Sequence, residues 1–180
     1  MELFKSKPVI AACDSERLAA AIESNAGAII YMNASINNLI SKQFQEYCQI
    51  KPIFVHIDLV KGLNGDKESL RFLRRHTKLY GIVSTKSNTL RAAKKEGFVT
   101  IQRIFLIDTQ SYLNSLEAIA QNQPDCIEIM PAIAPSILAK YREHVALPII
   151  VGGLVSSAEQ IAEAFRAGAD AVSLSKQELW

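Results

Sequence analysis

The sequence predicts an α/β protein with one domain over residues 1–180, folded as a compact (β/α)8 TIM barrel with a truncated eighth helix. Three observations indicate this fold. Eight short apolar segments recur along the chain, amphipathic helical stretches separate them, and the apolar segments are continuous rather than alternating. Continuous apolar strands are typical of a parallel sheet that helices cover. An open doubly wound sheet is the alternative, but no GxGxxG motif follows the first segment.

The predicted strands start about 20–30 residues apart, which is the length of one βα unit. Each is a short run of the residue types that favour strands. The strands are predicted at PVIAAC (8–13), GAIIYM (27–32), PIFVHIDL (52–59), GIVST (81–85), FVTIQRIFLI (98–107), CIEIM (126–130), PIIVGG (148–153) and AVSLS (171–175).

Helices are predicted between these strands at 15–25, 67–78, 88–97, 111–122 and 156–168. The last of them begins with a serine followed by Glu159, which resembles a capping box, and ends on Gly168. A TIM barrel usually needs about 200 residues or more. We therefore expect the final helix to be missing or to be supplied by a partner subunit in a homo-oligomer. The loop at 59–67 is the longest irregular segment and is a candidate lid.

Composition excludes several classes of protein. The formal net charge is +2, so any contact with RNA needs a local basic patch. The three cysteines are far apart and form no CxxC motif, which argues against a disulfide framework or a zinc site. No apolar run approaches the roughly 18 residues of a spanning helix. We expect a cytoplasmic protein with reduced thiols, no metal or cofactor, and no contact with a membrane.

Polar residues stand at the carboxyl ends of the predicted strands, where barrels place their binding sites. His56 and Asp58 are two residues apart, and the strand period of two puts them on one face. Unpaired buried charges are costly, so we expect Arg103 or Lys86 to pair with Glu128 or Asp58 around a polar ligand. A purely structural network is the alternative. The strand-end set is Asp14, Asn33, His56, Asp58, Lys61, Ser84, Thr85, Lys86, Gln102, Arg103, Asp108, Glu128, Gly152, Gly153, Ser173 and Ser175.

The segment VGGLVSSAEQ (151–160) predicts a phosphate site. Its strand ends on Gly152 and Gly153, whose backbone N–H groups can approach an anion closely, and a helix follows. Barrels often bind phosphate after the seventh and eighth strands, where Ser173 and Ser175 lie. A tight turn that needs glycine is the alternative explanation.

Two neighbouring predicted helices carry a second candidate site, an RNA-facing basic patch. Its cations recur at three- and four-residue spacing, which places several on one helical side. A solvated surface with no partner is the alternative. The patch residues are Arg71, Arg74, Arg75, Lys78, Arg91, Lys94 and Lys95.

Five segments at strand ends carry a family resemblance: VHIDLVKGL, GIVSTKS, IQRIFLIDT, IEIMPAI and VGGLVSS, in this order. With them the sequence resembles the glycerol uptake operon antiterminator family over nearly its whole length. The resemblance implies a non-enzymatic barrel that binds glycerol 3-phosphate and acts on the leader messenger RNA of its operon, permitting read-through of a terminator. It carries over, as mouth or effector residues, His56, Asp58, Lys86, Gln102, Arg103, Gly152 and Gly153.

In this hypothesis the effector phosphate lies on the diglycine amides and the serines of the eighth strand. Its hydroxyls reach toward Glu128, Asp58 and His56, while Arg103 and Lys86 neutralise the remaining charge. The competing hypothesis is a phosphate-ester enzyme on the same barrel, an aldolase, isomerase or phosphodiesterase. In that case His56, Asp58 and Glu128 would perform acid–base chemistry and Lys86 could form a Schiff base. A third possibility is a phosphate-binding barrel without either role.

Overall fold

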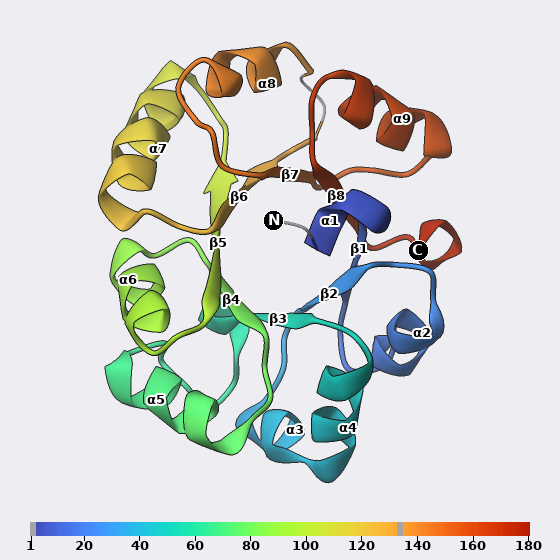
Figure 1. Ribbon diagram of the computed structural model, residues 1–180, viewed down its shortest axis with the longest axis vertical. Coiled ribbons are helices and arrows are strands. Elements are labelled where there is room, and N and C mark those ends of the chain that lie inside the picture. The colour runs from blue at the N-terminus through green and yellow to red at the C-terminus, as the bar shows by residue number, and fades with distance from the viewer. Residues whose placement is uncertain (1–2, 133–134) are drawn as a thin grey trace.

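The structure, a computed structural model, describes residues 3–132 and 135–180 and contains a closed barrel of parallel strands. Each strand pairs with the next one along the chain, and β8 pairs with β1 to close the ring (Figure 1). The predicted TIM barrel is confirmed, and the open doubly wound sheet is wrong. The strands are β1 (Val9–Cys13), β2 (Ala28–Tyr31), β3 (Ile53–His56), β4 (Gly81–Ser84), β5 (Val99–Phe105), β6 (Cys126–Met130), β7 (Ile149–Gly152) and β8 (Ala171–Leu174).

All helices except the first cover the outside of the barrel, and the first lies at the amino ends of the strands. The helices are α1 (Leu3–Ser6), α2 (Leu18–Glu23), α3 (Ile36–Ile40), α4 (Lys42–Ile50), α5 (Lys67–His76), α6 (Ser87–Lys95), α7 (Thr109–Asn122), α8 (Pro135–Arg142) and α9 (Ala158–Arg166), with 3-10 turns η1 (Ile57–Leu59) and η2 (Gln177–Leu179). The five predicted helices are confirmed as α2, α5, α6, α7 and α9. The turn η2 follows β8.

Helix capping explains where several helices begin. Ser41, Asp66, Asp108 and Ser157 each accept a hydrogen bond from a backbone N–H in the first turn of the following helix. The capping box of α9 pairs Ser157 with Gln160, so the prediction that Glu159 closes this box is wrong. The box needs the third helical residue, and that residue is Gln160.

The barrel interior is filled by apolar side chains, so the barrel is a packed core and not a pore. Phe4 of α1 joins this cluster from the amino ends of the strands, and its side chain is buried. In Figure 1, α1 lies in front of the ring of strands. The interior cluster comprises Phe4, Ile10, Ala28, Ile30, Phe54, Val83, Ile101, Cys126, Ile150 and Ala171.

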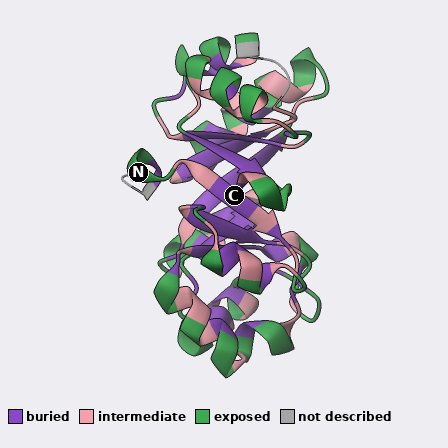
Figure 2. Cartoon of the chain, turned by 90° about the vertical axis from the view of Figure 1, so that its right-hand side faces the viewer, coloured by how far each residue is buried: buried purple, intermediate pink, exposed green. Residues whose placement is uncertain are grey.

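A second apolar layer lies between the strands and the outer helices. Leu70 and Leu73 of α5, for example, are fully buried three residues apart on the face toward the sheet. Figure 2 shows the result: buried residues gather in the central strands, and exposed residues lie on the outer sides of the helices. None of the helices described is long and apolar enough to cross a membrane.

Candidate functional site

A cavity of about 660 Å³ opens among the carboxyl ends of the strands. Its walls come from β1, β5, β6 and β8 and from the segments that follow β1, β2, β7 and β8. The lining contains both polar and apolar side chains, among them two arginines and two methionines. The lining residues are Ala12, Cys13, Asp14, Arg17, Met32, Asn33, Arg103, Met130, Gly153, Leu154, Val155, Ser156, Ser173, Leu174 and Ser175.

A buried ion pair lies beside this cavity. Arg103 and Glu128 are register partners in β5 and β6, and the Arg103 Nε lies 2.7 Å from the Glu128 Oε2. The side chains are 3% and 0% exposed. Ser173 of β8 donates a hydrogen bond to the other carboxylate oxygen, Oε1, at 2.5 Å. The predicted mutual pairing of strand-end charges is thus present, and its members are Arg103 and Glu128.

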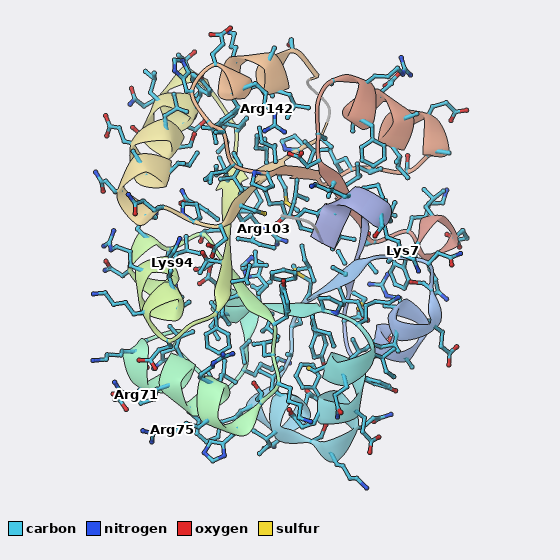
Figure 3. The ribbon with its side chains drawn as sticks, in the orientation of Figure 1. Lys7, Arg71, Arg75, Lys94, Arg103 and Arg142 are labelled. Atoms are coloured by element: carbon cyan, nitrogen blue, oxygen red, sulfur yellow. The ribbon has the colours of Figure 1, made fainter. Side chains whose placement is uncertain are left out.

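The Arg103 guanidinium retains donor capacity that the protein does not use. Its Nη1 lies 3.7 Å from the Met32 sulfur, a weak acceptor, and its buried Nη2 has no hydrogen-bond partner. A buried donor without a partner costs about 1–3 kcal/mol. Arg103 lines the cavity and lies near the centre of the ring (Figure 3), so an anion that enters there would meet this guanidinium.

His56 lies next to this pair and is neutral at pH 7. Its ring is buried, and its Nδ1 also has no partner. Burial lowers the pKa of His56 to about 4, and the positive charge of Arg103 acts in the same direction, against the carboxylates of Asp58 and Glu128. His56 pairs in register with Val83, which belongs to the interior cluster. The His56 side chain therefore also points into the barrel.

Asp58 does not share a strand face with His56, so that prediction is wrong. Strand β3 ends at His56, and Asp58 lies in the turn η1, where the period of two no longer applies. Its carboxylate accepts hydrogen bonds from the Ser84 hydroxyl (2.8 Å), the Thr85 backbone N–H (2.8 Å) and the Thr85 hydroxyl (3.0 Å). Asp58 therefore ties η1 to the end of β4 and does not line the cavity.

Two further residues predicted at the mouth lie elsewhere. Gln102 pairs in register with Ser84 on the outer face of the barrel, and its side-chain oxygen accepts a hydrogen bond from Asn122 of α7. A continuous apolar strand does not reveal which residues point inward, which is why the prediction for Gln102 is wrong. Lys86 is the exposed N-cap residue of α6 and is not part of the cavity wall.

The predicted phosphate corner does come together. Gly153, Ser173 and Ser175 line the cavity, and Gly153 has a φ of 78°, which favours glycine. Gly152 is needed for close packing, since a Cβ there would lie 2.1 Å from the Ser173 Oγ. The Ser173 hydroxyl, however, already donates to Glu128.

The backbone ahead of α9 has its own partner. The N–H groups of Ser156 and Ser157 donate to the Gln160 side-chain oxygen at 2.7 and 3.2 Å. An anion in this corner therefore meets arginines and hydroxyls more readily than the N-terminus of α9.

Arg17 is a cavity residue that the sequence analysis missed. Its guanidinium donates to both carboxylate oxygens of Asp14, at 3.3 and 3.2 Å, and to the Ser175 carbonyl at 2.9 Å. It also lies over the ring of Trp180, 6.0 Å from the ring centroid. The hydrogen bonds from Arg17 hold the pKa of Asp14 below its ordinary value. Arg17 lies three residues after Asp14, beyond the end of the first strand, so its position in the sequence did not mark it as a cavity residue.

The seven candidate RNA-binding residues lie on α5, on α6 and, for Lys78, just after α5. Figure 1 shows these two helices side by side on the outside of the barrel. They stand apart from the cavity wall, to which neither helix contributes a residue.

The geometry offers little to the enzyme hypothesis. None of the residues that line the cavity is a lysine, so Lys86 has no place there as a Schiff base. Burial raises the pKa of the Cys13 thiol to about 12, which keeps this cavity residue protonated and poorly nucleophilic. Over residues 3–132 and 135–180, no group of three or more His, Cys, Asp or Glu side chains is placed to hold a metal ion.

Comparison with known proteins gives a consistent set of relatives. The model of the family described as glycerol-3-phosphate responsive antiterminator matches residues 9–180. YgcP, an uncharacterised protein of Escherichia coli strain K12, is 36% identical over 184 residues, covering 100% of this chain and 95% of YgcP.

Two solved structures are similar over almost their whole length. The glycerol uptake operon antiterminator regulatory protein of Listeria monocytogenes superposes with a TM-score of 0.90 at 32% identity, covering 98% of this chain and 96% of that one. A glycerol uptake operon antiterminator-related protein of Thermotoga maritima has a TM-score of 0.80 at 26% identity, with 97% and 98% covered.

Proposed function

We propose that this chain, which belongs to the glycerol-3-phosphate responsive antiterminator family, senses glycerol 3-phosphate in the barrel cavity and thereby controls its binding to the leader messenger RNA of a glycerol uptake or utilisation operon. Membership of the family supports a regulator of transcription termination. A regulator of this kind acts in the cytoplasm, next to the transcript. The effector, the RNA and the response of one to the other are the parts of the proposal that need experiment.

One observation carries the effector part: Arg103 is buried, lines the cavity and leaves its Nη2 without a partner. A guanidinium presents several donors in a fixed plane, which suits the oxygens of a phosphate. Glu128 neutralises the charge of Arg103 and contacts its Nε, and the Nη2 of the same guanidinium is left without a partner. Binding an anion there would satisfy the orphaned donor and so remove an existing cost.

Other cavity residues suit the rest of such a ligand. The hydroxyls of Ser156 and Ser175 and the amide of Asn33 are exposed polar groups on the wall, and Met32 and Met130 add apolar surface to it. Arg17 supplies a second guanidinium, held in place by Asp14. His56 is not among the lining residues, but it lies beside Arg103, and since it is neutral it adds no repulsion to that cation.

Fluorescence of Trp180 offers a direct test of effector binding. Trp180 is the single tryptophan of the chain, and Arg17, a cavity residue, lies over its ring. We expect glycerol 3-phosphate to change this fluorescence saturably and to raise the melting temperature. Glycerol, without the phosphate, is expected to do neither at the same concentration.

Substitution of Arg103 completes the test. Arg103→Gln is expected to weaken glycerol 3-phosphate binding at least about tenfold, because hydrogen bonds to charged groups contribute about 1.5–3 kcal/mol. Lys86→Gln is the matched control, since Lys86 lies outside the cavity, and it is expected to bind as the unsubstituted chain does. No response of the unsubstituted chain to millimolar glycerol 3-phosphate would contradict the effector part of the proposal.

A regulator is favoured over an enzyme by the state of Glu128. Both of its carboxylate oxygens are engaged, one by Arg103 and one by Ser173, and the residue is fully buried. A general acid or base must reach the substrate. Turnover of glycerol phosphoesters that disappears in Glu128→Gln, with effector binding intact, would favour the enzyme.

A further inference from the structure

We propose that the leader RNA binds to one side of the molecule, the sector made by residues 64–98, along the groove between α5 and α6; this inference rests on the proposed function. The partner is a single-stranded stretch of RNA, held by contacts to its phosphates.

Charge is strongly segregated in this chain. Residues 64–98 contain nine Lys and Arg against three Asp and Glu, a net charge of +6. The remaining 145 residues contain eleven Lys and Arg against fifteen Asp and Glu, a net charge of −4. The total of +2 therefore conceals a basic sector on an otherwise acidic molecule. Such a local excess of cations is the electrostatic signature of a surface that meets nucleic acid.

Few of these cations are neutralised by neighbours. Among the described residues, the ion pairs of this sector are those of Arg71 with Glu68 and Glu96 and of Lys94 with Asp125. The third acid of the sector, Asp66, caps α5. The basic residues of the sector that form no ion pair with the described residues are Lys67, Arg74, Arg75, Lys78, Lys86, Arg91 and Lys95.

The cations without an ion pair differ in whether other contacts hold their side chains in place. Arg74 lies over the ring of Phe98, 5.4 Å from its centroid, and Arg91 donates to Asn88 and Asn122. Lys67, Arg75 and Lys95 are exposed, and their side chains make no hydrogen bond or ion pair with the described residues. Figure 3 shows Arg75 projecting from the outer edge of α5, beside Arg71. These exposed cations are free to contact the phosphates of an RNA backbone.

A groove runs between the two helices. It consists of two adjoining hollows of about 220 and 390 Å³ that share Lys67, Asn88 and Ala92. Arg91, Lys95 and Glu96 line the first hollow, and Asn64 and Asp66 line the second. Glu96 is paired with Arg71, and Asp66 caps α5. Cations and amide side chains are the groups that most often contact phosphate and sugar. The hollows follow α6, whose nine residues rise about 14 Å, and Lys67 lines them from the first turn of α5.

An aromatic pair at the end of α5 favours RNA over an acidic protein. The exposed ring of His76 lies 4.5 Å from the ring of Phe72, with a tilt of 36°. An unpaired base can stack on such a surface, whereas a carboxylate-rich peptide gains nothing from it. Basic residues in the last turns of α5 and α6 also stabilise the helix ends, but that role does not require seven unpaired cations.

The test uses the full chain and the triple variant Lys67→Gln, Arg75→Gln, Lys95→Gln. The probes are a labelled transcript of the operon leader and a labelled 20-nucleotide oligouridylate, titrated at several salt concentrations. We expect the variant to bind both RNAs at least about tenfold more weakly at low salt. We also expect the slope of log affinity against log salt to become shallower by about 2, since three single-strand phosphate contacts are removed.

The matched control is Lys42→Gln, Lys140→Gln, Arg166→Gln, which removes the same charge from α4, α8 and α9, where all three residues are exposed. Its affinity and salt slope are expected to change much less. The Trp180 response to glycerol 3-phosphate is expected to be the same in both triple variants, which shows that each is folded.

The outcomes separate this inference from the function on which it rests. If the unsubstituted chain binds no leader RNA, the proposed function fails. If it binds RNA and both triple variants lose affinity equally, the RNA surface lies elsewhere and this inference is overturned. Tighter binding of poly-L-glutamate than of the RNAs would overturn it in favour of an acidic protein partner.

Discussion

At the scale of single residues, the centre of the barrel is organised by the pair of Arg103 and Glu128. Taking two charges out of water costs several kcal/mol, and their attraction offsets this cost only when the remaining donors and acceptors are satisfied. Glu128 is fully satisfied, by Arg103 and Ser173, but Arg103 is not. Arg103 also lines the cavity, so a ligand bound there could supply the missing acceptor.

Arg103→Met is expected to lower the free energy of unfolding by about 3–5 kcal/mol, because it leaves the Glu128 carboxylate buried without its cation. The measurement is urea unfolding followed by Trp180 fluorescence. In the double variant Arg103→Met, Glu128→Gln, no buried charge remains, and the amide oxygen can still accept from Ser173. Most of the lost stability is therefore expected to return. A single variant that costs under about 1 kcal/mol, or a double variant no better than the single one, would contradict this account of the pair.

His56 gives the stability of the protein a specific dependence on pH. Its pKa is about 4 in the folded chain and 6.5 as the ordinary value. Between these values the unfolded chain binds a proton that the folded chain does not, so stability is full above pH 6.5 and declines as pH falls toward 4. We expect the unsubstituted chain to lose about 2 kcal/mol more than His56→Asn between pH 7.5 and pH 5. Urea unfolding at both pH values measures this, and parallel losses in the two proteins would refute the assignment.

At the scale of elements, the end of β7 is fitted closely to its neighbours. A side chain at Gly152 would place its Cβ 2.1 Å from the Ser173 Oγ, 3.1 Å from the Met130 Cε and 3.2 Å from the Glu128 Oε1. Separations below 3.0 Å require something to move. The glycine thus lets β7 and β8 approach while Ser173 reaches Glu128.

Gly152→Ala is expected to lower the free energy of unfolding by about 1–3 kcal/mol through overpacking. The same substitution made in a Ser173→Ala background is expected to cost clearly less, because the atom nearest to the new methyl group is gone. Thermal or urea unfolding of the four proteins completes the cycle. Equal costs in both backgrounds would show that the contact with Ser173 is not what excludes a side chain.

All eight strands were predictable from the sequence, because a strand buried on both faces reads as a short continuous apolar run. The same continuity conceals which residues point inward, so Gln102 was placed at the mouth although it bonds to Asn122 outside. The strand period also misled at Asp58, where β3 has already ended in the turn η1. The local sequence pattern identifies a strand, but only the pairing of strands in the closed barrel shows which of its residues point inward.

Helices and loops were less predictable for related reasons. The helix α3 buries only Leu39, and α4 buries only Phe44, so neither shows a strong apolar stripe. The sequence feature that could have predicted these two helices is the serine that caps each of them, Ser35 for α3 and Ser41 for α4. Arg17 escaped because its role depends on Ser175 and Trp180, which lie far away in sequence. Pairing among the buried strand-end charges was predictable, since such charges need partners, but the sequence left open whether Arg103 or Lys86 pairs with Glu128 or Asp58.

At the scale of the whole molecule, the two candidate sites occupy different parts of one barrel. The cavity is walled by β1, β5, β6, β8 and their neighbouring loops, whereas the basic sector covers β4 and its flanking helices α5 and α6. Asp58 belongs to the turn η1, which lies in the connection from β3 to β4. Its carboxylate accepts hydrogen bonds from Ser84 and Thr85 and so ties η1 to the end of β4, just before α6. An effector that contacts Arg103 can influence the RNA surface only if its binding favours one arrangement of this intervening region.

Loss of the Asp58 link is expected to weaken this communication. Asp58→Ala removes the hydrogen bonds to Ser84 and Thr85 without touching a cavity residue or a cation of the basic sector. We expect glycerol 3-phosphate and RNA each to bind with nearly unchanged affinity, and the effect of one on the other to decrease. Titrating each ligand in the presence and absence of the other measures that effect. An undiminished effect in Asp58→Ala would show that the signal takes another route.

The most direct test of the central claim is the affinity of the unsubstituted chain for its leader RNA, measured at one salt concentration with and without saturating glycerol 3-phosphate. The account predicts a change of about fivefold or more, the usual size of a coupling between two sites. It also predicts, by reciprocity, an equal change in effector affinity when RNA is bound. If the effector binds, as Trp180 reports, and the RNA affinity stays the same, the chain is not the sensor proposed here.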